Sequence, residues 1–329
     1  MNRKTRVWAT VALAAVGLLV SACSSRNAVN RPHDKAGGGG EGKYGYKFAV
    51  VTHGAAGDSF WSVVKAGAEK AGKDMGVSID YQSSGDPQAQ SQLIDAAVNQ
   101  KKDGIVVSMA NPQALKASIE RAVAARIPVI TVNAGQAESK SYGALEHIGQ
   151  DETVAGNAVG DQMKAAGLKN IICVIQEAGN IALEDRCKGV KSTFGGTVAN
   201  LQVNNANLPE AQATIKAKLQ SDKSIDGVVT LGGQIGTAAV QAIADSGSSA
   251  KIGTFDLNAD VAKLVEQGKI LFAVDQQPYL QGYLGVIMLT QYKANLNVLG
   301  GGLPVLTGPT IVTKDDAAAI VKLAQAGTR

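Results

Sequence analysis

Aromatic residues make up only 4% of this 329-residue chain, so any place where two of them are adjacent is informative. Histidine and cysteine are equally scarce, with three of each, and none of the histidines lies at a spacing from the cysteines that would suit a metal centre. Hydrophobic residues amount to 45% and charged residues to 18%, a balance that excludes a disordered chain. The mean hydropathy of +0.02 excludes a polytopic membrane protein.

Excess charge is also lacking. The formal net charge is +4, but Arg3, Lys4 and Arg6 belong to a predicted leader, so the remaining chain is close to neutral. A nearly neutral chain offers no basic patch for nucleic acid.

Segments that resemble catalytic or cofactor-binding motifs depart from those motifs at essential positions. Gly37–Tyr44 nearly matches a phosphate-binding loop, but it has Tyr44 where Ser or Thr belongs and it precedes the first strand, so it is interpreted as a linker. Gly232–Gly236 lacks the spacing of a dinucleotide-binding turn, and no nucleophile elbow is present. The sequence therefore predicts a protein that is not an enzyme and uses no cofactor and no metal.

The N-terminus has the pattern of an export signal. A basic start precedes the apolar run from Val7 to Val20, which is too short for a membrane span of about 20 residues. The run ends in Ser21-Ala22-Cys23, which resembles the lipobox of bacterial lipoproteins; the alternative is an ordinary signal peptide with an incidental cysteine. We expect a signal peptide over 1–22, lipidation of Cys23, a flexible tether over 23–45, and an extracytoplasmic protein anchored to the cell membrane by lipid.

Two cysteines remain after the leader. Cys173 lies in a predicted strand and Cys187 in the helix that follows it, so contact between them is geometrically feasible. Outside the cytoplasm such a pair can form a disulfide; two buried thiols are the alternative.

From Tyr46 onward, short β-branched runs alternate with longer amphipathic segments. Continuous apolar strands separated by helices indicate parallel sheets covered on both faces. The predicted strands are Lys47–Thr52, Val77–Tyr81, Gly104–Ser108, Pro128–Val132, Asn170–Ile175, Val198–Val203, Gly227–Thr230, Lys251–Thr254 and Ile270–Val274, and the predicted helices in the first half are Ser59–Ala71, Pro87–Lys102 and Pro112–Ala125.

The two halves of the chain resemble each other. The string that begins at Asp103-Gly104 returns at Asp226-Gly227, each time followed by a helix and a further strand. Although such strings are common in α/β proteins, the matching order of elements favours an α/β fold of two similar, doubly wound lobes. Ligands of such sheets bind at the carboxyl ends of the strands, so we expect a site in the cleft between the lobes.

Aromatic and polar residues follow the first strand. Asp58 precedes Phe60 and Trp61, and Trp61 is the only tryptophan after the leader. Aromatic faces pack on the carbon-bound hydrogens of carbohydrates, while a carboxylate binds their hydroxyls. The alternative is that the two rings fasten the following helix to the core.

Other predicted strand ends carry similar chemistry. Asn133, Asp256 and Gln276 follow strands, and Arg186 lies one turn into the helix after the strand of Cys173. Amide, carboxylate and guanidinium groups can each make paired hydrogen bonds to vicinal hydroxyls. Any one of them alone is more often a helix cap or a surface charge, but their convergence favours a binding site.

In this order the motifs resemble the periplasmic sugar-binding proteins of the ribose-binding type, the solute receptors of ABC importers. The resemblance covers about 47–313 and rests on the segments Asp58–Gly67, Ile127–Asn133, His147–Asp151, Arg186–Gly189, Gly253–Asp256 and Asp275–Pro278.

This resemblance implies a set of ligand-binding residues. Asp58 takes the place of the family's first-lobe amide, and Phe60 and Trp61 correspond to its stacking aromatics. The remaining positions that the resemblance assigns to the ligand, its neighbouring loops or the hinge are Asn111, Asn133, Gln150, Arg186, Asn207, Asp256 and Gln276.

One departure from the family pattern bears on the ligand. Members that bind ring sugars usually have Asp-Arg where this chain has Asn133-Ala134, a pair that grips the ring oxygen. Its absence, together with Thr52-His53-Gly54 followed by Asp58, resembles members that take up sugar alcohols. We therefore expect a four- or five-carbon polyol such as xylitol or threitol; a pentose receptor, or a sugar receptor that signals to a membrane sensor, is the alternative.

The resemblance also implies partners and boundaries. We expect a monomer that delivers its ligand to an ABC permease and its ATPase subunit, with a first lobe of 46–149 and 277–306 and a second of 150–276 and 307–329. A transcription regulator of this fold would need a DNA-binding motif where the leader and tether stand.

Overall fold

The computed structural model describes residues 44–55 and 57–329 and contains two six-stranded sheets. The first lobe consists of β1 (Lys47–Thr52), β2 (Ser78–Ser83), β3 (Gly104–Ser108), β4 (Val129–Val132), β5 (Glu146–Gly149) and β11 (Val305–Leu306), with helices α1 (Ser59–Met75), α2 (Pro87–Asn99), α3 (Pro112–Ala124), α4 (Gln136–Ser139) and α10 (Pro278–Asn295) and the short 3-10 helix η1 (Gly300–Gly302). The second lobe consists of β6 (Asn170–Ile175), β7 (Thr197–Gln202), β8 (Gly227–Thr230), β9 (Lys251–Phe255), β10 (Ala273–Asp275) and β12 (Thr310–Val312), with helices α5 (Glu152–Ala165), α6 (Ile181–Phe194), α7 (Leu208–Ser221), α8 (Gly233–Ser246), α9 (Ala259–Glu266) and α11 (Lys314–Gln325).

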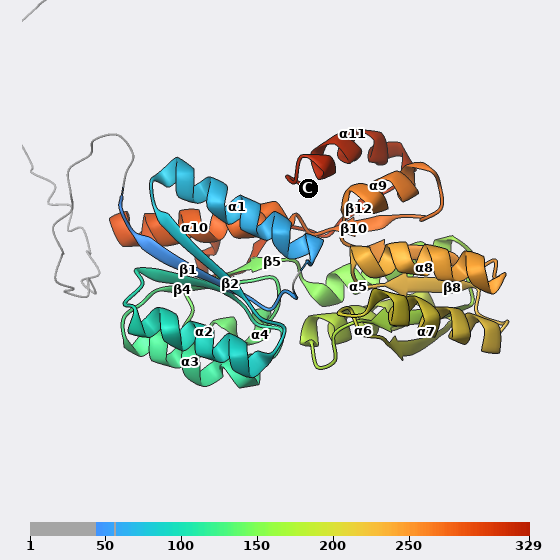
Figure 1. Cartoon of the computed structure of the whole chain (residues 1–329), viewed down its shortest axis with the longest axis horizontal. Helices are drawn as coiled ribbons and strands as arrows, with labels where there is room; N and C mark the ends of the chain where they lie inside the picture. The colour runs from blue at the N-terminus through green and yellow to red at the C-terminus, as the bar shows by residue number, and fades with distance from the viewer. Residues whose placement is uncertain (1–43, 56) are drawn as a thin grey trace, which may run out of the picture. The chain divides into compact units, whose positions relative to one another are not determined.

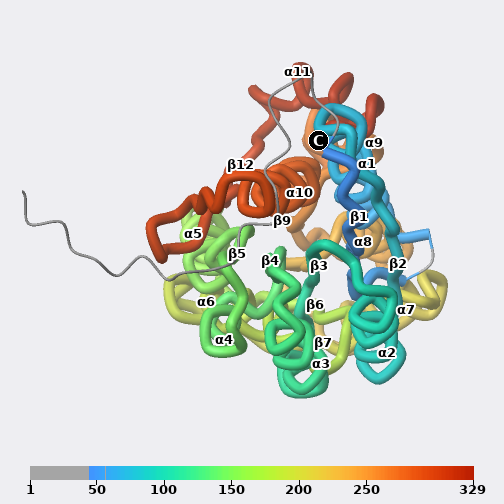
Figure 2. Tube along the Cα trace, turned by 90° about the vertical axis from the view of Figure 1, so that its left-hand side faces the viewer, coloured from blue at the N-terminus to red at the C-terminus, as the bar shows by residue number. Residues whose placement is uncertain are grey.

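The two sheets have the same strand order. From one edge they run β2-β1-β3-β4-β5-β11 and β7-β6-β8-β9-β10-β12, and the ladders are parallel except between β10 and β12. Helices cover both faces of each sheet: in the first lobe α1 and α10 lie on one side and α2 and α3 on the other (Figures 1 and 2). The expected fold of two similar, doubly wound lobes is confirmed.

The repeated string found in the sequence occupies equivalent places in the two lobes. Asp103 precedes β3, and its Oδ2 accepts a hydrogen bond from the Lys47 backbone N–H at the start of β1. Asp226 precedes β8, and its carboxylate accepts from the backbone N–H groups of Lys169 and Asn170 at the start of β6. The repeat is therefore structural, since each aspartate fixes the same pair of strands.

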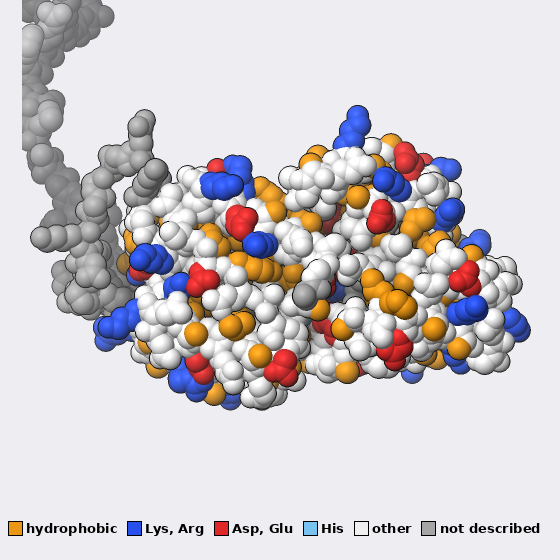
Figure 3. Space-filling view, viewed as in Figure 1, with side chains coloured by type: hydrophobic (Ala, Val, Ile, Leu, Met, Phe, Trp, Pro, Cys, Tyr) orange, Lys and Arg blue, Asp and Glu red, His pale blue; other side chains and the backbone are white. Residues whose placement is uncertain are grey.

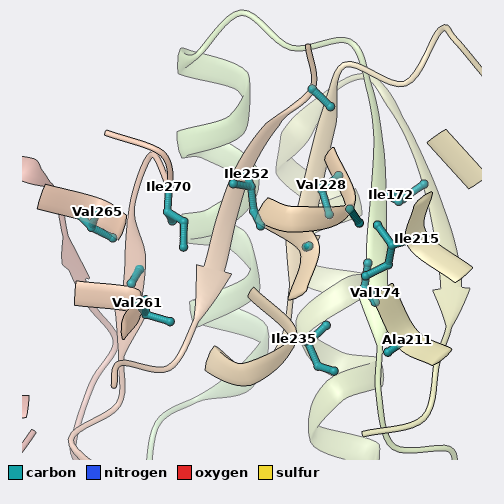
Figure 4. Close-up of a cluster of buried hydrophobic side chains, with 14 of the residues drawn as sticks. Ile172, Val174, Ala211, Ile215, Val228, Ile235, Ile252, Val261, Val265 and Ile270 are labelled. Atoms are coloured by element: carbon teal, nitrogen blue, oxygen red, sulfur yellow. The ribbon is translucent and has the colours of Figure 1, made fainter. Parts of the chain in front are cut away.

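The core of each lobe forms on both sides of its sheet because alternate residues of a strand point to opposite faces. In the second lobe, Ile172 and Val174 of β6 lie beside α7, in a cluster to which α8 and α9 also contribute (Figure 4). Ile171 and Cys173 of the same strand face α5 and α6. The sulfur of Cys173 is joined to that of Cys187 in α6. Of the two alternatives that the sequence allowed, a disulfide or two buried thiols, the structure contains the disulfide.

The helices begin where the sequence provides N-caps. Asp58, Asp86, Asp151 and Asn180 each accept a hydrogen bond from a backbone N–H of the first helical turn through their side chains. Each of these caps lies in a loop that follows a strand, and such loops are where parallel sheets place their ligand-binding residues.

Several predicted boundaries differ from the structure by one to four residues, among them the end of α1 at Met75 where Ala71 was expected. The helix expected over Pro87–Lys102 ends at Asn99, because Lys101 adopts a left-handed backbone with φ of 53°. The strand expected over Ile270–Val274 is Ala273–Asp275, and β2 extends to Ser83. The short strands β5, β11 and β12 carry too few residues for a pattern.

The chain passes between the lobes at three places within the described residues. These crossings follow β5, β10 and β11 and lead into α5, α10 and β12. The predicted signal peptide and the predicted lipidation site Cys23 lie outside the described residues. Of the predicted tether only Tyr44 and Gly45 are described, and their N–H groups donate to the carbonyls of Met75 and Gly76.

Candidate functional site

A cavity lies where the carboxyl ends of the two sheets face each other. It encloses about 610 Å³, part of it open to solvent, and residues of both lobes line it. The predicted residues that the structure brings together around it are Asp58, Phe60, Trp61, Asn133, Arg186, Asp256 and Gln276.

The first-lobe wall is aromatic. Phe60 and Trp61 pack edge to face with ring centroids 5.0 Å apart, and the His53 ring lies 4.6 Å from that of Trp61. A Cβ on Gly54 would overlap the Trp61 side chain, so this position requires glycine. Phe60 and Trp61 are both buried beside Val64, so they fasten α1 and line the cavity at once.

His53 is held as a neutral ring. Its Nδ1 lies 2.7 Å from the Ser108 hydroxyl, and its backbone N–H donates to the same oxygen. Burial, and secondarily the charge of Arg186, lower the pKa of His53 to about 3. The nearest carboxylate, Glu177, lies 3.8 Å from Nε2.

The second-lobe wall contains a fixed cation. Arg186 Nε donates to Glu152 Oε2 at 2.6 Å, Nη2 donates to Oε1 at 2.9 Å, and Nη1 donates to the Leu231 carbonyl at 3.1 Å. The guanidinium also lies 4.7 Å from the centre of the Phe255 ring. Burial opposes the charge of Arg186, but the adjacent Glu152 carboxylate more than compensates and raises its pKa. The guanidinium is thus oriented before anything binds.

Gln276 connects the two lobes at the back of the cavity. Its Oε1 accepts from Asn133 Nδ2 at 2.9 Å, and its Nε2 donates to Asp256 Oδ1 at 2.6 Å. Gln281 Nε2 donates to the same Oε1, and the Thr307 hydroxyl donates to the Gln276 carbonyl. One amide side chain therefore positions a polar residue from each lobe.

Two of these residues have unusual backbones. Asn133 follows β4 with φ of 64°, and Asp256 follows β9 with φ of 67°. Left-handed backbone is uncommon outside glycine, and residues held in it cluster at functional sites. The two residues stand at equivalent strand ends of the two lobes.

Burial makes the cavity's carboxyl groups weaker acids. Desolvation raises the pKa of Asp256 to about 7, although Arg186 and Gln276 oppose the shift. It raises the pKa of Asp58 to about 6 against the hydrogen bond from the Phe60 N–H, and it raises the pKa of Glu177 as well. Near neutral pH the Asp256 carboxyl can therefore serve as both a donor and an acceptor of hydrogen bonds.

Residues 48–296 match the periplasmic binding protein domain family. The chain belongs to this family. It is a sugar-binding solute-binding protein of the ribose-binding type, as the sequence motifs predicted.

A solved structure that resembles this binding protein is the carbohydrate transporter of Acidothermus cellulolyticus 11B in complex with myo-inositol. The two are 45% identical, the match covers 87% of this chain and 100% of the other, and the TM-score is 0.86.

Curated relatives are more distant. The ribose import binding protein of Haemophilus influenzae is 26% identical over 69% of this chain and 79% of its own length. The xylose/arabinose-binding protein of Sulfolobus acidocaldarius is 24% identical over 68% of this chain, and the match spans 60% of that protein.

Three predicted residues lie elsewhere in the binding protein. Asn111 caps α3 by accepting from the Ala114 N–H and lines a neighbouring cavity. Asn207 is an exposed cap of α7. Gln150 is buried at the first crossing between the lobes, where its Nε2 donates to Glu152 Oε2 at 2.8 Å.

Sequence reasoning missed several cavity residues. Glu177 lines the cavity, and Asn180 and Asn205 both donate to its carboxylate. The available signal was position, because the missed residues follow β1, β6 and β7 as the predicted ones follow β1, β4 and β9. His53, Gln176, Glu177, Asn180 and Asn205 belong to this missed set.

Two further features of the described residues concern metal ions and membrane spans. Among residues 44–55 and 57–329, no three His, Cys, Asp or Glu side chains are grouped to hold a metal ion. Over the same residues, no helix combines the length and hydropathy needed to cross a bilayer.

Proposed function

We propose that this binding protein is the receptor of an ABC importer for a polyol that lacks a ring oxygen, with myo-inositol as the first ligand to test. The observation that carries the proposal is the convergence of Asp58, Arg186 and Asp256 on one cavity beside Trp61. Each polar group can bind hydroxyls that both donate and accept hydrogen bonds. The Trp61 ring can pack against the apolar face of a polyol.

The first-lobe strand end supports a ligand without a ring oxygen. Asn133 Nδ2 is already bound to Gln276, and Ala134 stands where ring-sugar binders of the family usually have an arginine. Asp256 Oδ2 has no protein donor among the described residues, so a ligand hydroxyl can donate to it. The arrangement thus favours hydroxyl recognition over recognition of a ring oxygen or an anomeric centre.

The sequence and the comparison with known proteins favour polyols of different sizes. The sequence led us to expect four or five carbons, as in xylitol or threitol. The 45% identical relative holds myo-inositol, a six-carbon ring that shares with those polyols the absence of a ring oxygen. Because that relative is matched over its whole length, we place myo-inositol first and the acyclic polyols second.

We propose that ligand binding closes the lobes over the cavity. The lobes are assigned as 46–149 with 277–306, and 150–276 with 307–329, and they would move about the three crossings. A ligand that contacts both lobes binds the closed state better and so shifts the population toward it. The closed receptor would then deliver the polyol, as a monomer, to a permease whose separate subunit hydrolyses ATP.

We propose from the pattern of Val7–Cys23 that the protein is attached to the membrane. We expect Cys23 to carry the lipid, which would hold the receptor beside its permease outside the cytoplasm. Labelling of cells with radioactive palmitate should mark the wild-type protein and leave Cys23→Ser unlabelled. Equal labelling of both would overturn the assignment of this residue.

Isothermal titration calorimetry tests the ligand class. The panel is myo-inositol, xylitol, threitol, ribose and xylose, and we expect saturable binding of a polyol with weaker or no binding of the pentoses. Asp256→Ala should abolish binding while Asp260→Ala, on the exposed side of α9, should leave it unchanged. Binding of pentoses alone would contradict the polyol assignment and leave a pentose receptor in its place.

A further inference from the structure

A second cavity adjoins the first between the two lobes. It encloses about 870 Å³, part of it open to solvent. Its first-lobe wall includes Gly85, Ala110 and Asn111, and its second-lobe wall includes Gln202 and Asn204. It is therefore a separate space beyond the one assigned to the polyol.

The two cavities share a wall of five residues, namely His53, Gln176, Glu177, Asn180 and Asn205. Asn180 Nδ2 donates to Glu177 Oε2 at 2.6 Å, and Asn205 Nδ2 donates to Oε1 at 3.0 Å. These bonds hold the carboxylate at the junction, opposite the neutral His53 ring. The shared wall therefore places the two cavities side by side.

Gln176 leaves an unused acceptor at this junction. Its side chain is 8% exposed, and Oε1 has no hydrogen-bond partner among the described residues. A buried acceptor without a donor is unfavourable because it has lost its hydrogen bonds to water. A donor that arrives with the ligand would satisfy it.

The surface of the second cavity is more apolar than polar, and among the described residues it carries several amide side chains and no positive charge. Asn111 and Asn204 use their carbonyl oxygens to accept backbone N–H groups, which leaves their amide N–H groups available. Within the part of the chain that the structure describes, Glu177 is the only acid on the wall, and neither Lys nor Arg contributes to it. A neutral sugar ring, which has apolar faces as well as hydroxyl groups, fits this lining, whereas a phosphate would face a carboxylate without a counter-charge.

We infer that the receptor binds a glycosylated polyol, with the polyol in the first cavity and a neutral sugar ring in the second. The inference rests on the proposed function and specifies its substrate class. Gln176 and Asn205 would bind the hydroxyls next to the glycosidic bond, and Asn111 and Asn204 the outer sugar. The ligand contacts in the second cavity then add to those of the polyol alone.

Calorimetry with myo-inositol and with a galactosyl myo-inositol tests this inference on the purified protein. We expect the galactoside to bind at least about tenfold more tightly, a difference of roughly 1.4 kcal/mol. Gly85→Leu should remove that advantage and leave the dissociation constant of myo-inositol within about twofold. A Cβ at Gly85 would meet only the His53 carbonyl oxygen, at 3.8 Å, so the fold should tolerate the change.

Ala110→Leu is a second, independent substitution in the same wall, and Gln88→Leu on the exposed surface of α2 is the matched control. Binding of myo-inositol with equal or weaker binding of the galactoside would overturn the inference and leave the proposed function intact. Tighter binding of an inositol phosphate than of the galactoside would also overturn it. If neither myo-inositol nor the galactoside binds, the proposed function fails and the inference fails with it.

Discussion

Arg186 faces the cavity with its charge already balanced by Glu152. The guanidinium donates two hydrogen bonds to that carboxylate and one to the Leu231 carbonyl. Its remaining N–H groups are left for a ligand. Gln150, at the first crossing between the lobes, donates to the same carboxylate. Glu152 therefore links the hinge to the residue that we expect to bind the ligand.

Glu152→Gln should weaken ligand binding without contact between residue 152 and the ligand. The amide can accept one hydrogen bond from Arg186 but no longer holds it in a bidentate pair, so the guanidinium loses its orientation. We expect the dissociation constant for the polyol to rise about tenfold, or roughly 1.4 kcal/mol, by calorimetry. Glu184→Gln on the exposed face of α6 is the control, and an unchanged constant for Glu152→Gln would contradict the role.

Asp256 should make stability depend on pH in a defined direction. Its pKa rises from 3.8 to about 7 on burial, so the folded protein holds a proton there that the unfolded chain releases. The stability from this group is fully present below its unfolded pKa and is lost as pH rises through about 7.

The comparison with Asp256→Asn isolates this effect, because asparagine does not titrate and keeps an oxygen for Gln276. The Tm of the wild type minus that of the variant should increase as pH is lowered from about 8 to about 5. A difference in Tm that stays constant across this range would show that Asp256 is charged in the folded protein.

Helix α6 is tied to its sheet by a covalent bond. Cys187 neighbours Arg186 in α6, and its partner Cys173 lies in strand β6, 14 residues earlier in the chain. The bond restricts the unfolded chain and also limits how far α6 can move from the sheet. It thus acts on the element that presents Arg186.

Removal of this disulfide should cost stability more than it costs binding. For Cys173→Ala/Cys187→Ala we expect a loss of about 2–4 kcal/mol in the free energy of unfolding, measured in urea. The affinity for the polyol at low temperature should change little, since Glu152 still orients Arg186. A variant with unchanged stability would show that the reduced chain already confines this loop.

Much of the fold could be predicted because long, buried parallel strands such as Lys47–Thr52 and Asn170–Ile175 are continuous apolar runs. The edge strands β11 and β12 could not, since two or three residues adopt extended structure only through their partners. Most of the aromatic and polar cavity residues could be predicted from their places at strand ends. Glu177 was missed although it follows β6, because its place in the cavity depends on Asn205 from a separate loop as well as on Asn180.

Contacts between the lobes show how the whole molecule closes its cleft. The Gln234 side chain donates to the Gly57 carbonyl at 3.2 Å, and the Ile181 N–H donates to the Ala110 carbonyl at 3.1 Å. On the face seen in Figure 3, basic and acidic side chains are interspersed, so no large surface of one sign gathers there. Selection of the ligand is therefore left to the cavity between the lobes.

The central claim, that the cleft binds a polyol, is tested most directly by a titration of tryptophan fluorescence. Trp61 lines the cavity and is 5% exposed, so a bound ligand should change its emission. The account predicts a saturable change with myo-inositol that ribose and xylose do not produce, and no such change in Trp61→Phe. A saturable response of the wild type to ribose or xylose, with none to myo-inositol, xylitol or threitol, would contradict it.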